Sequence, residues 1–306
     1  MNGIDTSPEA FEKYLERTRA TSTKAKYVFA AKQLLHFATA NDIHSFETLP
    51  RNTLEAYVEM LVDQGYAAAS IHVYQSGAKK YLRWVENQGV PVAQLNAPEA
   101  PRITHATRDA LPPDTMSAFF RIANELLEPT RTAVMLLPCT GLRAAEMVQL
   151  PLSAIRPVSL ETSEGPRNTI ALVVTGKGGK TRVVPLIEEG VTILTEYLTG
   201  HRRKQPGSWV FPGNLTRKNR RGQNPMSLRS LRDGVIYVRE ALKMTFTPHT
   251  MRRTYLTSLY RRGVEPATLA KIAGHANIQT LFKHYLALDM HDVTSAIHKH
   301  GARLYD

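Results

Sequence analysis

The chain has 306 residues, enough for two domains of ordinary size, and 42% of them are hydrophobic, so each domain can bury a core. Residues 1–106 hold 11 basic and 11 acidic residues, so the other 28 basic and 16 acidic residues supply the whole net charge of +12. A basic half beside a neutral half predicts a polyanionic partner, which would be double-stranded DNA or RNA. The alternative is a basic protein with no nucleic-acid role.

Cysteine content and hydropathy indicate the cellular compartment in which the protein is expected. The single cysteine, Cys139, follows the apolar run Val134 to Leu137 and has no partner for an internal disulfide, so we expect a buried thiol. No apolar stretch approaches the roughly 20 residues of a membrane span. The first residues lack the pattern of a secretory signal. These features predict a cytoplasmic protein that does not enter a membrane, and a DNA partner would make it nucleoid-associated.

The first part of the chain, residues 8–92, has helical periodicity. Amphipathic segments run up to Ala40, from Leu54 to Val62 and onward from about Ser70, which predicts a bundle of about four helices over residues 1–92. The third segment also carries a basic cluster on its polar side. A solvated helix face is one interpretation of this cluster and phosphate contact is the other. Its members are Lys79, Lys80 and Arg83.

Residues 93–112 are rich in proline and lack periodicity, so they are predicted to form a linker. The second domain, residues 113–306, is predicted to be mainly α-helical, with helices at 113–126, 129–149, 188–203 and most of 227–300. One β-hairpin is expected from Thr169–Val174 and Thr181–Leu186. A basic loop precedes the last helices, and its candidate phosphate contacts are Arg217, Lys218, Arg220 and Arg221.

Four short segments of the second domain carry chemistry-bearing side chains. In the first, Gly141 ends one helix and Arg143 opens the next, where free N–H groups favour an anion. Glu146 lies one turn on and could orient Arg143, although the two could equally form a surface ion pair. In the second, Lys177 is expected at the tip of the hairpin, within Gly-Lys-Gly. A mobile tip could bring its ammonium to a leaving oxygen, or Lys177 could be an ordinary exposed turn lysine. Arg182, on the following strand, is a candidate DNA contact.

The third segment begins with Thr247 as a helix cap and Pro248 at the first helical position. His249 and Arg252 are three residues apart, so they share a face of that helix, which is expected to reach Gly263. Imidazole exchanges a proton near neutral pH, and guanidinium grips two phosphate oxygens. Such pairs also occur by chance on many helices.

The fourth segment places His275 in a break after Gly274, which ends a short helix that starts at Pro266. Tyr285 follows one helix later, in Lys-His-Tyr. A lone histidine or tyrosine in such places is usually structural. The segment becomes informative only together with the other three, because it comes last in their order along the chain.

The order Arg, Lys, His-x-x-Arg, Gly-His, Tyr, from about residue 107 to 290, resembles the catalytic domain of tyrosine recombinases, the lambda-integrase-like and Xer-like enzymes. Residues 8–92 resemble that family's helical core-binding domain in layout. The family's tyrosine most often lies nine residues after the Gly-His histidine, whereas here that position is His284 and Tyr285 is tenth. The resemblance implies six catalytic residues: Arg143, Lys177, His249, Arg252, His275 and Tyr285.

The resemblance implies a site-specific recombinase that cuts and rejoins DNA through a 3′-phosphotyrosine, without ATP. It also implies a tetramer on two duplexes, formed from a chain that can be a monomer when free. The segment Ala287 to Ala296 would dock on a neighbour or fold back on its own domain. No cofactor or metal is expected, because two arginines can balance charge and zinc-like or paired acidic motifs are absent from the sequence.

Two other functions remain open from the sequence. One is a non-catalytic, architectural DNA-binding protein on the same fold. The other is a telomere-resolving or type IB topoisomerase-like enzyme, which would share the tyrosine nucleophile but act alone or on hairpins. Formation of a covalent DNA adduct separates the first alternative from an enzyme.

Overall fold

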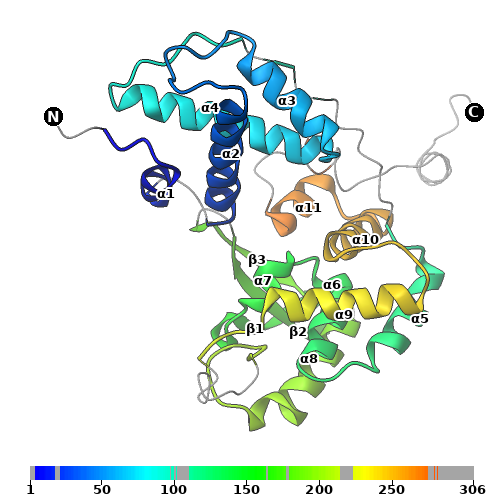
Figure 1. Cartoon of the computed structure of the whole chain (residues 1–306). Coiled ribbons are helices and arrows are strands. Elements are labelled where there is room, and N and C mark those ends of the chain that lie inside the picture. The colour runs from blue at the N-terminus through cyan, green and yellow to red at the C-terminus, as the bar shows by residue number, and fades with distance from the viewer. Residues whose placement is uncertain are drawn as a thin grey trace, which may run out of the picture. The chain divides into compact units, whose positions relative to one another are not determined.

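A computed structural model describes residues 4–17, 21–96, 98–99, 101, 110–162, 165–176, 179–213, 223–274, 279 and 281. The chain divides into two compact units, Met1–Ala106 and Thr107–Asp306 (Figure 1). Each unit has its own hydrophobic core. The fold is mainly α-helical with one small sheet, as the sequence predicts.

The first unit contains four α-helices among its described residues. Aromatic rings of α1 and α4 meet in its core, where the Phe11 ring lies 5.2 Å from that of Tyr81 and 5.3 Å from that of Trp84. The Tyr81 hydroxyl donates a 2.6 Å hydrogen bond to the carbonyl of Thr6, which fixes the start of the chain against the bundle. The helices are α1 (Pro8–Glu16), α2 (Thr21–Ala40), α3 (Thr53–Asp63) and α4 (Ala68–Asn87).

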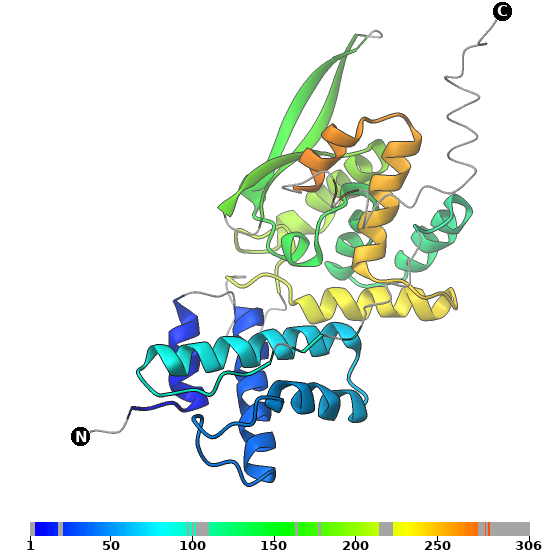
Figure 2. The ribbon, with the colours of Figure 1, turned by 90° about the horizontal axis from the view of Figure 1, so that it is seen from above.

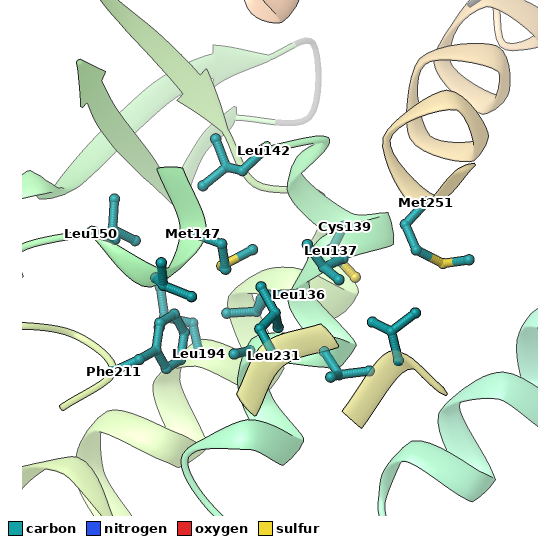
Figure 3. Packing of buried hydrophobic residues seen from close by; sticks show 14 of the residues in the cluster. Leu136, Leu137, Cys139, Leu142, Met147, Leu150, Leu194, Phe211, Leu231 and Met251 are labelled. Carbon is teal, nitrogen blue, oxygen red and sulfur yellow. The ribbon is translucent and has the colours of Figure 1, made fainter. Parts of the chain in front are cut away.

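The second unit is built around α6 (Thr130–Thr140), whose side chains from Thr132 to Thr140 are buried except for Met135. Helices from several parts of the chain pack on it and enclose an apolar core (Figure 3). Cys139 is part of this core, as expected, and burial raises the pKa of its thiol to about 12. The other α-helices are α5 (Pro113–Ala123), α7 (Ala144–Val148), α8 (Glu188–Gly200), α9 (Leu228–Ala241), α10 (Pro248–Arg261) and α11 (Pro266–Ala273); short 3₁₀ turns span Leu152–Ala154 and Arg202–Lys204.

A three-stranded antiparallel sheet has the order β1-β2-β3 and lies beside α11 (Figure 2). The strands are β1 (Ile155–Thr162), β2 (Gly165–Thr175) and β3 (Thr181–Pro185). The predicted hairpin is therefore present, with Thr175 opposite Thr181. The first strand was not predicted. It is an edge strand, where Pro157 is tolerated because one side of the strand needs no backbone donor.

Candidate active site

Arg143 stands at a sharp turn between two helices. Helix α6 ends at Gly141, which adopts a left-handed conformation with φ 61°, and Arg143 is the N-cap of α7. A Cβ at position 141 would lie 2.4 Å from the Tyr255 ring, so only glycine fits both the backbone and the packing. The turn therefore fixes where the Arg143 side chain emerges. That side chain is 38% exposed.

Glu146 joins two arginines. Its carboxylate accepts the backbone N–H of Arg143 at 2.8 Å and Nη1 of Arg143 at 2.8 Å. It also accepts Nη1 and Nη2 of Arg182 at 2.9 and 2.7 Å, which is a bidentate pair. The expectation that Glu146 orients Arg143 agrees with this geometry. The surface-pair interpretation does not, because the Glu146 side chain is only 7% exposed.

The two guanidinium groups hold Glu146 ionised. Burial by itself raises the pKa of this carboxyl, but hydrogen bonds from Arg182 and Arg143 and the charge of Arg182 outweigh burial and lower the pKa to about 2. The cluster of two arginines and one carboxylate therefore keeps one net positive charge at neutral pH.

Arg252 comes from α10 and is fully buried. As predicted, this helix starts at Pro248, and the Thr247 hydroxyl accepts the backbone N–H of Thr250. The Arg252 guanidinium donates from Nη1 to the Gly141 carbonyl at 2.6 Å and from Nη2 to the Ala273 carbonyl. Both carbonyls lie at the C-terminal ends of helices, α6 and α11, where positive charge is favourable. One side chain thus ties the turn before Arg143 to the turn before His275.

Arg143, His249 and Arg252 line a single cleft of about 520 Å³. His249 is exposed in it, whereas Arg252 forms part of its wall. The cleft therefore unites Arg143, at the start of α7, with His249 and Arg252, which both come from α10. Its helix α9 wall adds Arg232 and Arg239, which the sequence analysis missed. The two arginines are seven residues apart, so they lie on one face of the helix. This spacing is the sequence signal that could have identified them.

A second cleft, of about 590 Å³, lies between β3 and α11 and shares Arg143 with the first. Lys180 and Lys271 line it and are exposed. Arg143 therefore stands between two basic hollows. This arrangement suits a polyanion whose successive phosphates cross the surface of the second unit.

The DNA contact predicted for Arg182 stays a prediction, but most of its side chain has another role. Its side chain is only 9% exposed, and its guanidinium is bonded to Glu146 and, from Nε at 2.8 Å, to the Ile272 carbonyl. Residues 182 and 184 share the inner face of β3, and Val184 is buried while Val183 is 57% exposed. Arg182 is therefore largely buried, although it lines part of the second cleft.

Other predicted residues have different outcomes. Lys79 and Lys80 are half-buried on α4 and Arg83 is exposed, and the Lys80 ammonium lies 5.5 Å from the centre of the Tyr14 ring. Their phosphate contacts stay a prediction. Several predicted residues lie outside the described residues: Lys177, His275, Tyr285, Arg217, Lys218, Arg220 and Arg221. The residues before Lys177 and His275, which are Gly176 and Gly274, are described and border the Arg182 side chain.

Among the described residues, no three histidine, cysteine, aspartate or glutamate side chains gather in a way that could hold a metal ion. Over the same residues, no helix combines the length and the apolar character needed to cross a membrane.

The chain matches two family models in the order of its two units. Residues 9–89 match the N-terminal SAM-like domain of phage integrases, and residues 109–292 match the phage integrase family. The second match alone covers more than half of the chain. The chain belongs to the phage integrase family, the tyrosine recombinases, which are enzymes that cut and rejoin DNA strands.

The chain is similar to Xer recombinases, and the alignments cover most of both chains. Tyrosine recombinase XerC of Mesorhizobium japonicum is 29% identical over 293 residues, covering 90% of this chain and 89% of the relative. Tyrosine recombinase XerD of Caulobacter vibrioides is 24% identical over 309 residues, covering 94% of each. These alignments include both units, so the two-unit organisation is shared.

Solved structures share the fold. The XerH site-specific recombinase bound to palindromic difH substrate has a TM-score of 0.71 at 17% identity, covering 97% of this chain and 86% of that one. A lambda integrase dimer bound to a COC′ core site has a TM-score of 0.68 at 18% identity, covering 92% and 76%. The site-specific recombinase function implied by the sequence motifs is thus supported from family, relatives and fold.

Proposed function

We propose that this recombinase breaks a DNA phosphodiester by attack of Tyr285 and holds the strand as a 3′-phosphotyrosine. The observation that carries the proposal is the cleft in which Arg143, His249 and Arg252 meet, although Arg143 is more than 100 positions from the other two. Two guanidinium groups and an imidazole in one hollow match the needs of a phosphate that gains negative charge in its transition state.

The arginines supply charge balance. A phosphodiester anion repels nucleophiles, and the pentavalent transition state concentrates more charge on its non-bridging oxygens. Arg252 is fixed by two carbonyls and Arg143 by Glu146, so their donors need little reorganisation when the charge develops. Arg143 with Arg182 and Glu146 carries one net positive charge, and Arg252 adds another guanidinium.

The proton steps complete the transesterification. The Tyr285 oxygen bonds to phosphorus while the bond from phosphorus to the 5′-oxygen breaks. The phenolic proton leaves with the help of His249, and Lys177 donates a proton to the departing 5′-oxygen. His275 hydrogen-bonds a phosphate oxygen. The phosphotyrosine keeps the energy of the broken bond, so a second 5′-hydroxyl reverses the step without ATP.

Double-stranded DNA is the proposed substrate, and binding is led by its phosphates. Solved structures of the same fold include a recombinase on difH substrate and an integrase on a core site. In this chain, Arg232 and Arg239 of the first cleft and Lys180 and Lys271 of the second are accessible or partly accessible cations. They extend the positive surface beyond the reacting phosphate.

The working assembly we propose is a tetramer on two duplexes, since exchange of strands needs two sites that each bind two copies. Residues 287–296 would dock on a neighbouring copy. A chain that acts on cellular DNA is expected in the cytoplasm with the nucleoid. Size measurement with and without DNA tests the assembly: a monomer that becomes a tetramer on DNA agrees with the proposal.

The covalent intermediate can be trapped on a nicked duplex. The duplex sequence is first selected from random-sequence DNA with the full chain, and a nick near the cleavage point lets the 5′-hydroxyl fragment diffuse away. The intact protein is expected to give a DNA adduct that survives SDS, and Tyr285→Phe is expected to give none. DNA binding without an adduct would instead favour the architectural, non-catalytic function.

A further inference from the structure

Arg182 occupies a point where three parts of the site meet. Its guanidinium binds both oxygens of Glu146, at 2.9 and 2.7 Å, and Glu146 in turn binds Arg143. Its Nε donates to the Ile272 carbonyl at the end of α11. The side chain is almost buried, so these bonds are shielded from water and from salt.

Two glycines show how closely the neighbouring segments approach Arg182. A Cβ on Gly274 would lie 3.0 Å from Cδ of Arg182, and a Cβ on Gly176 would lie 3.4 Å from its Nη1. Gly274 also has a φ of 65°, which suits glycine. Gly176 precedes Lys177, and Gly274 precedes His275. Arg182 therefore touches the residue before each of two proposed catalytic residues and shares a carboxylate with a third.

The base of the hairpin is also fixed next to Arg182. The Gly176 N–H donates to the Lys180 carbonyl at 2.8 Å, and the Gly179 N–H donates to the Gly176 carbonyl at 3.2 Å. The described ends of this turn, Gly176 and Gly179, are therefore both anchored. The turn starts within van der Waals distance of the Arg182–Glu146 pair.

We propose that Arg182 is a positioning residue, which sets the β2–β3 hairpin, and with it the leaving-group acid, relative to Arg143 and the Gly274 turn. The inference deepens the proposed function and rests on it. In this role Arg182 acts through Glu146 and the neighbouring glycine turns, and not on the reacting phosphate. Its replacement should therefore impair proton delivery to the 5′-oxygen more than it impairs the other parts of the reaction.

A sulfur leaving group separates a defect in proton delivery from a defect in the other parts of the cleavage reaction. In a nicked duplex whose scissile bond joins phosphorus to a 5′-bridging sulfur, attack by Tyr285 breaks the P–S bond and the thiolate leaves with its electron pair. A thiolate needs no proton, because thiols are far more acidic than alcohols. Single-turnover cleavage is measured for the oxygen and sulfur duplexes at saturating protein, and the ratio of the two rates does not depend on the folded fraction of a preparation.

With the oxygen duplex, Arg182→Met is expected to cleave roughly 100-fold more slowly, the scale of a lost general acid. With the sulfur duplex, most of that loss should disappear. Arg156→Met, on the exposed face of β1, removes the same charge from the same sheet and should behave like the unmodified protein with both duplexes. Affinity for DNA should be unchanged by Arg182→Met.

An equal loss with oxygen and sulfur would overturn the proposal, since Arg182 would then support only the fold, and so would no loss at all. Where Arg182→Met does not fold, Arg182→Lys keeps the charge but cannot form the bidentate pair, and the same ratio decides. If the unmodified protein forms no adduct with either duplex, the proposed function fails, which is a different result from a failure confined to Arg182.

Discussion

Arg143 and Arg252, the two arginines proposed to bind the reacting phosphate, are held in different ways. Arg252 is buried and donates to two backbone carbonyls at helix ends. Arg143 is 38% exposed and shares the Glu146 carboxylate with Arg182, so the cluster keeps one positive charge. Buried Arg252 thus forms a rigid wall of the cleft, whereas Arg143 belongs to an ion-paired network with Glu146 and Arg182. We expect Arg252 to contribute more to the stability of the fold than the partly exposed Arg143.

The largest expected effect comes from removing the buried Arg252 side chain. Arg252→Ala removes donors from two helix ends and leaves a cavity, so the free energy of unfolding should fall by roughly 2–4 kcal/mol and adduct formation should stop. Arg143→Ala should also stop adduct formation, but it should cost only about 1 kcal/mol because the side chain is partly exposed. Urea unfolding of both variants measures the difference. Equal destabilisation would contradict the comparison.

The turn that carries Arg143 offers the next test. Gly141→Ala forces a Cβ into the Tyr255 ring as well as a left-handed backbone, so we expect a loss of roughly 2 kcal/mol or more. Gly263 is a matched control, since its φ is 91° and nothing lies within 4 Å of its Cβ position. Gly263→Ala should cost about 1 kcal/mol from backbone strain alone. Similar costs would show that the Tyr255 contact is unimportant.

Acid should weaken the network. The folded pKa of Glu146, about 2, lies below the ordinary value of 4.5, so its stabilisation is complete above pH 4.5 and is lost as the pH falls towards 2. Allowing for solvent screening, the loss should be roughly 2 kcal/mol. Urea unfolding of the parent and of Glu146→Gln at several pH values checks this. The variant should lack that part of the pH dependence, and identical profiles would contradict the assigned pKa.

The smallest expected effect concerns Arg232 and Arg239, the arginines that α9 contributes to the first cleft. Replacing Arg232 or Arg239 by alanine should weaken DNA binding at all sequences and reduce the magnitude of the slope of log affinity against log salt by about one. Titrations at several salt concentrations measure the slope. An unchanged slope for both variants would remove α9 from the proposed phosphate contacts.

Local sequence signals predicted much of this structure. Thr247-Pro248 marked the start of α10, and Gly141 and Gly274 marked the ends of α6 and α11, because capping depends on a few neighbouring residues. The predicted hairpin was also present. Edge strand β1 was missed because Pro157 and the polar residues around it oppose a strand signal, while its pairing with β2 comes from tertiary structure.

The site was harder to predict in detail. The motif order indicated which residues act, but it gave Arg182 only as a candidate DNA contact, because a strand with adjacent valines does not reveal which face is buried. Its partners Glu146 and Ile272 are 36 and 90 positions away, beyond the reach of local periodicity. The convergence of Arg143 and Arg252 was likewise implied by resemblance and not by spacing.

The most direct measurement compares a charged with a neutral reacting phosphate. Arg143→Ala and the unmodified protein are incubated with nicked duplexes that carry either the ordinary phosphate or a methylphosphonate, which lacks the negative charge, at the cleavage position. We expect Arg143→Ala to form no adduct with the phosphate and to regain it with the methylphosphonate, while Tyr285→Phe forms neither. Equal inactivity of Arg143→Ala with both duplexes would contradict the role of the cleft in balancing charge at the phosphorus that Tyr285 attacks.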